Sequence, residues 1–234
     1  MRVAFDREIE FARVIVLFGA FGSGKSEIAL NLAHRLRAQG HDTALVDADY
    51  YKPLFRSGGF KNPLEKRGIR VILPPGELAH ADVTALPPEI YGVIETGPNV
   101  VFDVGGETGA RVLGALAGRF RPGSYETLLV VNTRRPDART ADALVDAAER
   151  MKAISRLPVA GLAANTNLGP ASTIEVAREG YQLAAEAARR LGVPVKFVAL
   201  DEGLMDRLSP DDFPLPVLPV RRYLLPPWEV EEED

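Results

Sequence analysis

The sequence contains no cysteine. It therefore has no disulfide framework, no thiolate metal site, no iron–sulfur cluster and no thiol nucleophile. The three histidines, His34, His41 and His80, are scattered along the chain. No two of them have the i, i+4 spacing of a metal-binding pair on a helix. We therefore expect no structural metal site.

Long apolar runs are also missing. No segment approaches the roughly 18 consecutive apolar residues that a membrane-spanning helix needs. Residues 1–11 lack the apolar stretch of a signal peptide, because charged side chains interrupt them at Arg2, Asp6, Arg7, Glu8 and Glu10. The sequence predicts a cytoplasmic protein without a membrane span.

Positive charge is not in excess. The chain has 28 Lys and Arg residues against 32 Asp and Glu residues, and its formal net charge is -4. Because nucleic acid attracts basic surfaces, this balance disfavours nucleic acid as a partner. What the sequence does have is length: its 234 residues, 46% of them apolar, are enough to bury the core of one α/β domain.

Short apolar runs alternate with segments of helical period. This alternation predicts an α/β fold of three layers, in which a mostly parallel sheet of about seven strands is covered by helices on both faces. The runs are short, rich in Val, Ile and Leu, and bordered by turn residues, which favours buried strands over helices. The expected strands cover residues 13–18, 43–47, 69–73, 99–103, 126–132, 158–164 and 194–200.

Three helices are predicted from apolar positions that repeat at helical spacing. The first carries an apolar stripe over residues 28–36, and the second covers about 137–154. The third covers about 172–191, with Ser172 expected to cap its start and Gly192 to follow its end. We expect these helices to cover the faces of the sheet.

Two stretches are less regular. Residues 49–95 contain several Gly and Pro pairs and predict loops and short helices over one edge of the sheet. Residues 209–234 are rich in proline and end in acidic residues, so we expect a tail that lies across the surface and has a disordered end. The predicted division is a nucleotide-binding domain over 1–208 and a tail over 209–234.

Residues 19–26, GAFGSGKS, match the pattern G-x-x-x-x-G-K-[ST] directly after an expected strand and before an expected helix. Glycines let successive backbone N–H groups face inward, and the helix adds its positive end to this anion cradle. Lys25 would reach the β- and γ-phosphates, and the Ser26 hydroxyl would ligate Mg²⁺. The predicted nucleoside triphosphate site comprises Gly19, Ala20, Phe21, Gly22, Ser23, Gly24, Lys25, Ser26 and Glu27.

Carboxylates follow two of the expected strands. Asp47 and Asp49 come after the second strand, and Asp103 ends a later one before two glycines. Ligands of α/β sheets collect at the carboxyl ends of strands, so Asp103 is predicted to hold the Mg²⁺ water shell. Asp49 is predicted to act at the metal and to orient the attacking water. For Asp47 and Asp49 the alternative is a structural role, accepting N–H groups of the turn.

The segment DVGG reads as D-x-x-G, starting at Asp103. A backbone N–H at Gly106 beside the γ-phosphate would let this loop respond to hydrolysis. The segment is therefore a predicted nucleotide-dependent switch.

With these motifs, the chain resembles the MinD/ParA/CobQ branch of P-loop ATPases over about residues 13–202. The resemblance rests on the phosphate loop, the Asp-x-Asp after the second strand, the D-x-x-G, and an Asn after a strand in GLAANTN. It implies a P-loop NTPase fold, ATP and Mg²⁺ as ligands, and ATPase activity. It also implies that Asn165 reads adenine and that Asp201 belongs to a region that closes over the base.

The phosphate loop departs from the family pattern K-G-G-x-G-K. Ala20 and Phe21 stand where the family has its early lysine and the first glycine of the pair. In the family that lysine reaches across a homodimer to the partner's nucleotide, so a homodimer here would lack this contact. Candidate replacement cations, each of which could instead be a solvated or ion-paired surface residue, are Arg56, Arg134, Arg135 and Arg139.

Three functions are compatible with these residues. The favoured one is a regulatory or assembly ATPase whose nucleotide state sets its affinity for an unidentified protein partner. The second is a small-molecule kinase or an ATP-dependent ligase, with residues 49–53 binding the acceptor. The third is a nucleotide-gated binding module whose tail docks a partner through Tyr223 and Trp228, although packing of that tail on the protein's own surface is the favoured alternative.

Overall fold

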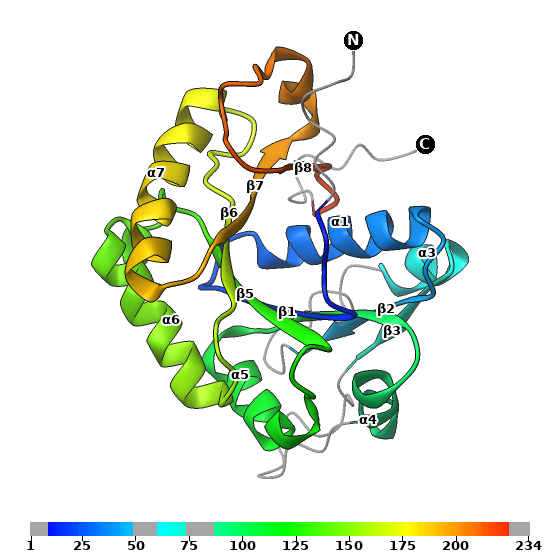
Figure 1. Ribbon diagram of the computed structural model, residues 1–234. Coiled ribbons are helices and arrows are strands. Elements are labelled where there is room, and N and C mark those ends of the chain that lie inside the picture. Colours follow the sequence, from blue (N-terminus) through cyan, green and yellow to red (C-terminus); the bar gives the residue numbers. More distant parts are fainter. Residues whose placement is uncertain (1–8, 49–59, 74–86, 225–234) are drawn as a thin grey trace.

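The computed structural model describes residues 9–48, 60–73 and 87–224, and these form one sheet with helices on both sides (Figure 1). All neighbouring strands run parallel. The eight strands lie in the order β3-β2-β4-β1-β5-β6-β7-β8. They are β1 (Val14–Phe18), β2 (Thr43–Asp47), β3 (Ile69–Ile72), β4 (Asn99–Asp103), β5 (Tyr125–Val131), β6 (Gly161–Ala164), β7 (Val195–Asp201) and β8 (Val217–Val220).

The predicted fold class is confirmed. Each of the seven expected runs forms a strand, and the central strands are apolar because both of their faces are covered. The eighth strand, β8, lies in the proline-rich segment and pairs with β7. The sequence did not predict it. The domain boundary at residue 208 stays a prediction, but part of the expected tail belongs to the sheet.

One face of the sheet is covered by α1 (Lys25–Ala38) and α3 (Lys61–Lys66). The apolar stripe of α1, including Ile28 and Leu32, packs on side chains such as Leu45 and Val101 of the central strands. This packing fixes the start of α1 next to the end of β1, which is the point where the phosphate loop lies.

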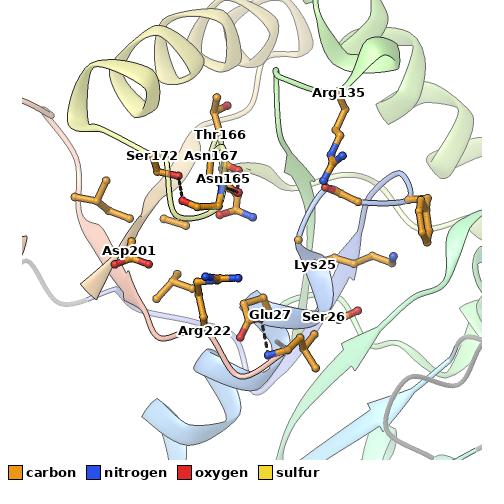
Figure 2. A pocket seen from close by; sticks show the side chains of 18 of the residues that line it. Lys25, Ser26, Glu27, Arg135, Asn165, Thr166, Asn167, Ser172, Asp201 and Arg222 are labelled. Carbon is orange, nitrogen blue, oxygen red and sulfur yellow. Dashed lines mark hydrogen bonds between the residues drawn. The ribbon is translucent and has the colours of Figure 1, made fainter. Parts of the chain in front are cut away.

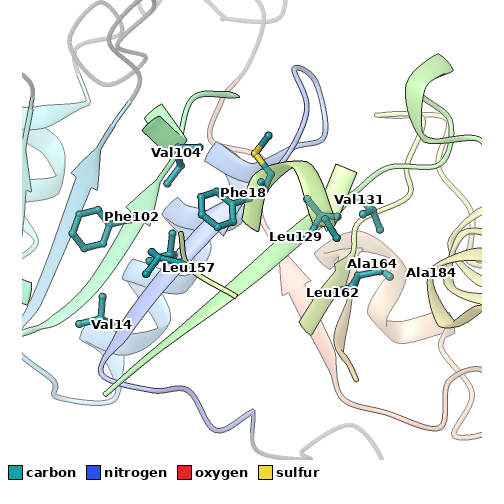
Figure 3. Close-up of a cluster of buried hydrophobic side chains, with 14 of the residues drawn as sticks. Val14, Phe18, Phe102, Val104, Leu129, Val131, Leu157, Leu162, Ala164 and Ala184 are labelled. Carbon is teal, nitrogen blue, oxygen red and sulfur yellow. The ribbon is translucent and has the colours of Figure 1, made fainter. Parts of the chain in front are cut away.

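The other face is covered by α4 (Pro88–Glu95), α5 (Gly106–Ala115), α6 (Ala141–Ser155) and α7 (Ile174–Leu191). Figure 3 shows its core, in which Phe18 and Phe102 are fully buried and Ala184 of α7 packs near Leu162. Close packing of this kind leaves the strand ends little freedom to shift. Short 3₁₀ helices cover Ala117–Arg119, Pro136–Ala138 and Glu202–Arg207.

The start of α7 differs from the prediction by one residue. Thr173, not Ser172, caps this helix, because its hydroxyl accepts a hydrogen bond from the backbone N–H of Val176 at 3.3 Å. The Ser172 hydroxyl instead donates to the Gly169 carbonyl at 2.6 Å and stabilises the preceding loop. The predicted end is confirmed, since Gly192 adopts the left-handed conformation at φ 69°.

The irregular stretch over residues 49–95 contains α3, β3 and α4, with β3 at one edge of the sheet. Asp49 and Arg56 lie outside the described residues, as does Trp228. Among the described helices, none combines the length and the apolar character that crossing a membrane requires.

Candidate functional site

The loop over residues 19–26 connects β1 to α1 and depends on glycine at two positions. Gly22 and Gly24 have φ values of 74° and 84°, a region that residues with a side chain rarely adopt. The N–H of Ser23 donates to the Ala20 carbonyl at 3.1 Å and closes a tight turn. The loop therefore curls at the N-terminal end of α1, where free backbone N–H groups and the helix dipole favour an anion.

Two side chains from distant segments hold this loop in place. The side-chain amide of Asn165 donates to the Ser23 carbonyl at 2.8 Å, and both residues are buried. The guanidinium of Arg135 donates to the Gly22 carbonyl at 2.8 Å. A Cβ atom on Gly24 would lie only 2.2 Å from the Asn165 amide nitrogen, so glycine is also required for this close approach. The loop is thus ordered by contacts with residues that follow β5 and β6.

Two carboxylates lie at the carboxyl ends of neighbouring strands. Asp47 of β2 and Asp103 of β4 are paired in register, and each residue is 2% exposed. The backbone continues the pairing, since Ala48 donates its N–H to the Asp103 carbonyl at 2.8 Å. Asp103 is also the register partner of Leu17 in β1, next to the start of the phosphate loop. This register brings Asp103 to the edge of the sheet where the loop lies.

A cavity of about 480 Å³ opens at this edge (Figure 2). Its volume falls within the ~300–1,000 Å³ range of small-molecule sites. Its lining brings together most of the predicted site residues, namely Phe21, Gly22, Gly24, Lys25, Ser26, Glu27, Asp103, Asn165 and Asp201. The predicted residues Gly19, Ala20, Ser23 and Gly106 are described but do not line this cavity, and Gly106 is the first residue of α5.

The residues at the phosphate-loop end of the cavity suit a phosphate group and Mg²⁺. Lys25 supplies a positive charge, and because the residue is only 9% exposed, water screens it less than it would a surface lysine. The Ser26 hydroxyl and the Asp103 carboxylate line the same cavity and offer oxygen ligands. Mg²⁺ prefers such ligands, takes few of them from the protein, and keeps several waters. The donor set therefore fits the predicted metal.

The opposite end of the cavity is formed by the loop after β6 and by the end of β7. Within the loop, the Asn167 amide donates to the Asn165 carbonyl at 2.8 Å, and its side-chain oxygen accepts from the Gly169 N–H at 3.3 Å. Asp201, the last residue of β7, accepts a hydrogen bond from the Gly203 N–H at 2.9 Å. Asn165 and Asp201 thus line the part of the cavity where the sequence predicts the base, and the Asn165 amide also supports the phosphate loop.

Glu27 makes a contact that the sequence did not predict. Its carboxylate accepts hydrogen bonds from the backbone N–H groups of Tyr223 and Leu224 at 2.6 and 3.1 Å. Burial raises the pKa of Glu27 above its ordinary value, and these two hydrogen bonds and the nearby Arg222 offset only part of the rise. The Glu27 side chain is therefore engaged with the segment that follows β8.

This segment adds Arg222 and Leu224 to the wall of the cavity. Neither was predicted as a site residue. The sequence signal is a polar stripe on α1, formed by Glu27, Asn31 and His34 at helical spacing. That spacing identifies one helix face but not the segment that it contacts.

The candidate replacement cations have different surroundings. Arg135 lines the cavity and contacts the phosphate loop, as described above. Arg134 forms an exposed ion pair with Glu179, and Arg139 is exposed. Phe21, at the position of the missing family glycine, is 88% exposed at the tip of the loop. Arg135 is therefore the predicted arginine that the structure brings to the site.

Comparison with known proteins gives one family match. The sequence model described as CbiA, the CobQ/CobB/MinD/ParA nucleotide binding domain, matches residues 14–172 of this chain. The match covers the phosphate loop, both strand-end carboxylates and the loop after β6. No curated protein is similar enough to count as a match.

Solved structures with a similar fold include a signal recognition particle receptor, a signal recognition particle protein and FlhF. The signal recognition particle receptor FtsY from Elizabethkingia anophelis is 18% identical, with a TM-score of 0.51 over 89% of this chain and 62% of that one. The 54 kDa signal recognition particle protein from Aeropyrum pernix K1, in complex with GDP, is 22% identical, with a TM-score of 0.52 over 83% and 44%. FlhF complexed with GTP and Mg²⁺ is 16% identical, with a TM-score of 0.53 over 80% and 65%. In each case this chain spans less than two thirds of the other protein, and the likeness concerns the fold alone.

Proposed function

Because this chain belongs to the CobQ/CobB/MinD/ParA family of nucleotide-binding domains, we propose that it binds ATP with Mg²⁺, hydrolyses it, and changes its affinity for a protein partner with its nucleotide state. One observation carries this proposal. The glycine loop, Lys25, Ser26 and Asp103 line the same cavity at the N-terminal end of α1. An anion cradle, a fixed cation and oxygen ligands for a metal are the parts that polyphosphate binding needs.

The residues act by position and charge. Loop N–H groups and Lys25 bind the phosphates, and the Ser26 hydroxyl and Asp103 hold Mg²⁺ through direct or water-mediated contacts. The bound metal would neutralise charge that builds up on the phosphates. Anchoring by Asn165 and Arg135 keeps the loop in its binding conformation, so little ordering cost remains when the nucleotide arrives.

Hydrolysis also requires a positioned water and a cation near the transferred phosphate. We assign the orientation of the attacking water to Asp49, which lies outside the described residues. For the cation, the placement of Arg135 supports a role from within the same chain, because its guanidinium contacts the Gly22 carbonyl and lines the cavity. Basal turnover is then slow until a partner completes the site, as in other P-loop switches.

The preferred base is a separate part of the proposal. Adenine is assigned from the family resemblance, with Asn165 and Asp201 at the base end of the cavity. A carboxylate such as Asp201 could also accept hydrogen bonds from the N–H groups of guanine, and two of the fold neighbours were solved with GDP or GTP. Binding tests must therefore compare ATP with GTP.

Nucleotide-dependent thermal stability tests the proposal. At a ligand concentration of about 100 times Kd, binding stabilises the folded state by about 2.7 kcal/mol, which for a chain of this size raises Tm by about 5–10 °C. The wild-type protein should show this rise with MgATP, and Lys25→Ala should not, while the two apoproteins unfold at similar temperatures. Absence of any rise with either ATP or GTP in the wild type would contradict the proposal.

Phosphate release separates ATPase from kinase or ligase activity. An ATPase should release phosphate from ATP without a second substrate, whereas a kinase or ligase should need its acceptor. Measuring release alone and then with a panel of metabolites distinguishes the two. Sedimentation of the protein with ATP and with ADP tests the homodimer, which should form in only one nucleotide state if it belongs to the switch.

A further inference from the structure

Residues 221–224, here called the C-terminal segment, follow β8 and run along α1. The side-chain amide of Asn31 donates to the Arg221 carbonyl and accepts from the Arg221 N–H, both at 2.9 Å. The Asn31 amide therefore satisfies both backbone hydrogen-bonding groups of Arg221, as a residue of a neighbouring β-strand would. One helical turn further along, the His34 ring stacks on Tyr223 with ring centroids 4.8 Å apart. Together with Glu27, these side chains dock the segment on one face of α1.

Docking places a charged pair at the border of the phosphate site. Glu27 directly follows Ser26 in the first turn of α1 and lines the same cavity, so it lies near the proposed position of the phosphates. An uncompensated carboxylate there would repel them. Two backbone N–H groups of the C-terminal segment provide most of the compensation, and the positive charge of Arg222 contributes less. The segment thus makes the start of α1 compatible with an anionic ligand.

Arg222 is also directed toward the ligand space. Its half-buried side chain lines the cavity, and Figure 2 shows the guanidinium pointing into the open space between Asp201 and Glu27. The Lys25 side chain extends away from Arg222 and Asp201. If Lys25 binds the terminal phosphates and the base lies near Asp201, the group nearest to Arg222 is the α-phosphate with its ribose ester.

We propose that Arg222 is a nucleotide-binding residue that contacts the α-phosphate, and that Asn31 is a positioning residue that holds the C-terminal segment for this contact. The inference rests on the proposed function, because it concerns a ligand of the same cavity. It assigns binding of the proximal part of the nucleotide to a segment beyond residues 14–172, the part of the chain that the family model matches. A guanidinium suits this role because it donates several hydrogen bonds to phosphate in a fixed geometry.

Affinity measurements with three probes test the assignment. Arg222→Gln should weaken binding of MgATP and MgADP by about tenfold or more, the scale of a charge-assisted hydrogen bond. Inorganic pyrophosphate, which fills the terminal phosphate positions and lacks the ester, should lose much less affinity, because the two backbone N–H groups that bind Glu27 remain in the variant. Arg222→Lys should restore part of the loss.

The neighbouring arginine provides a matched control. Arg221 has an exposed side chain that lies 3.9 Å from Glu202 and does not line the cavity. Arg221→Gln should therefore bind all three probes like the wild type.

A double-mutant cycle tests the positioning role. Asn31→Ala should weaken ATP binding only through Arg222, so the variant combining Asn31→Ala with Arg222→Gln should bind no more weakly than Arg222→Gln alone. Additive losses would overturn the role of Asn31.

The remaining outcomes are distinct. ATP and ADP affinities of Arg222→Gln within twofold of wild type, or an equal loss for pyrophosphate, would overturn the α-phosphate contact while leaving the proposed function intact. A wild-type protein that binds neither ATP nor ADP would overturn the proposed function and the Arg222 contact together.

Discussion

The hydrogen bond from the Asn165 amide to the Ser23 carbonyl leads to a prediction that separates two roles of one residue. The bond is 2.8 Å long, and the two residues are 6% and 3% exposed. Water therefore does not readily replace the donor when Asn165 is changed to alanine. Leaving a buried carbonyl without this donor costs about 1–3 kcal/mol. For a chain of this size, a loss of about 2 kcal/mol lowers Tm by about 4–8 °C.

The effect on ligands follows from the same bond. Without Asn165, the phosphate loop must be ordered when the ligand binds, so every ligand that uses the loop should bind more weakly. We expect Asn165→Ala to lower the affinities for pyrophosphate, ATP and GTP by a similar factor, about tenfold for each 1.4 kcal/mol. A residue that only reads adenine would instead weaken ATP selectively and leave pyrophosphate unchanged.

The assay is a calorimetric titration of each ligand with Mg²⁺, together with thermal unfolding of the apoprotein. Asn99→Ala serves as a control, since Asn99 is half-buried at the start of β4, at the opposite edge of the sheet from the loop. It should leave all three affinities unchanged. If Asn165→Ala unfolds at the wild-type temperature and binds pyrophosphate normally, the anchoring role is wrong.

Two further variants probe the metal and the docked segment. Asp103→Asn should reduce the increase in ATP affinity that Mg²⁺ produces, measured by titrating each protein with ATP in the presence and in the absence of Mg²⁺. If Mg²⁺ raises the ATP affinity of the variant as much as that of the wild type, Asp103 is not a metal residue. Burial, with Arg67 and Arg221 nearby, lowers the pKa of His34. The folded state therefore binds fewer protons than the unfolded state at this residue, and stability is lost as pH falls through the ordinary His value of about 6.5. His34→Gln should thus show a smaller fall in Tm between about pH 7.5 and 5.5 than the wild type. The control variant His41→Gln, changed at an exposed histidine, should behave like the wild type. Equal falls in Tm for all three proteins would rule out a contribution of His34 to the pH dependence of stability.

The strands show how far local sequence could predict the fold. β2 matches its predicted bounds because a buried parallel strand is apolar on both faces and needs no alternation. β8 was missed because Pro216 and Pro219 interrupt the pattern that identifies a strand. At the sheet edge this is tolerated: Pro219 pairs in register with Leu200, and among the described residues no strand lies on the other side of β8 to accept the N–H that proline lacks.

The site likewise has a part that local sequence could predict and a part that it could not. The phosphate loop could be predicted because its chemistry depends on a short, contiguous motif between a strand and a helix. The contacts of Asn31 with Arg221 join residues 190 positions apart, and no local period encodes such a pairing. The capping residue of α7 was predicted one position too early, because Ser172 and Thr173 are adjacent hydroxyl residues. The loop after β6 uses Ser172, and Thr173 caps the helix. Sequence patterns thus predicted residues at both ends of the cavity and missed Arg222 and Leu224, which the segment after β8 adds to its wall.

The strand order gives the cavity two chemically different sides. β1, which carries the phosphate loop, has β4 and β2 on one side and β5, β6, β7 and β8 on the other. The first side ends in the buried carboxylates Asp47 and Asp103. The second contributes the loop anchors Arg135 and Asn165, and beyond β8 it contributes Arg222. Because the two sides come from different strands, we expect that the proposed metal site near β4 and the proposed base site near β7 can be altered independently. Substitutions on the β4 side should therefore change metal dependence without changing the preference for ATP or GTP, and substitutions at the end of β7 should do the reverse.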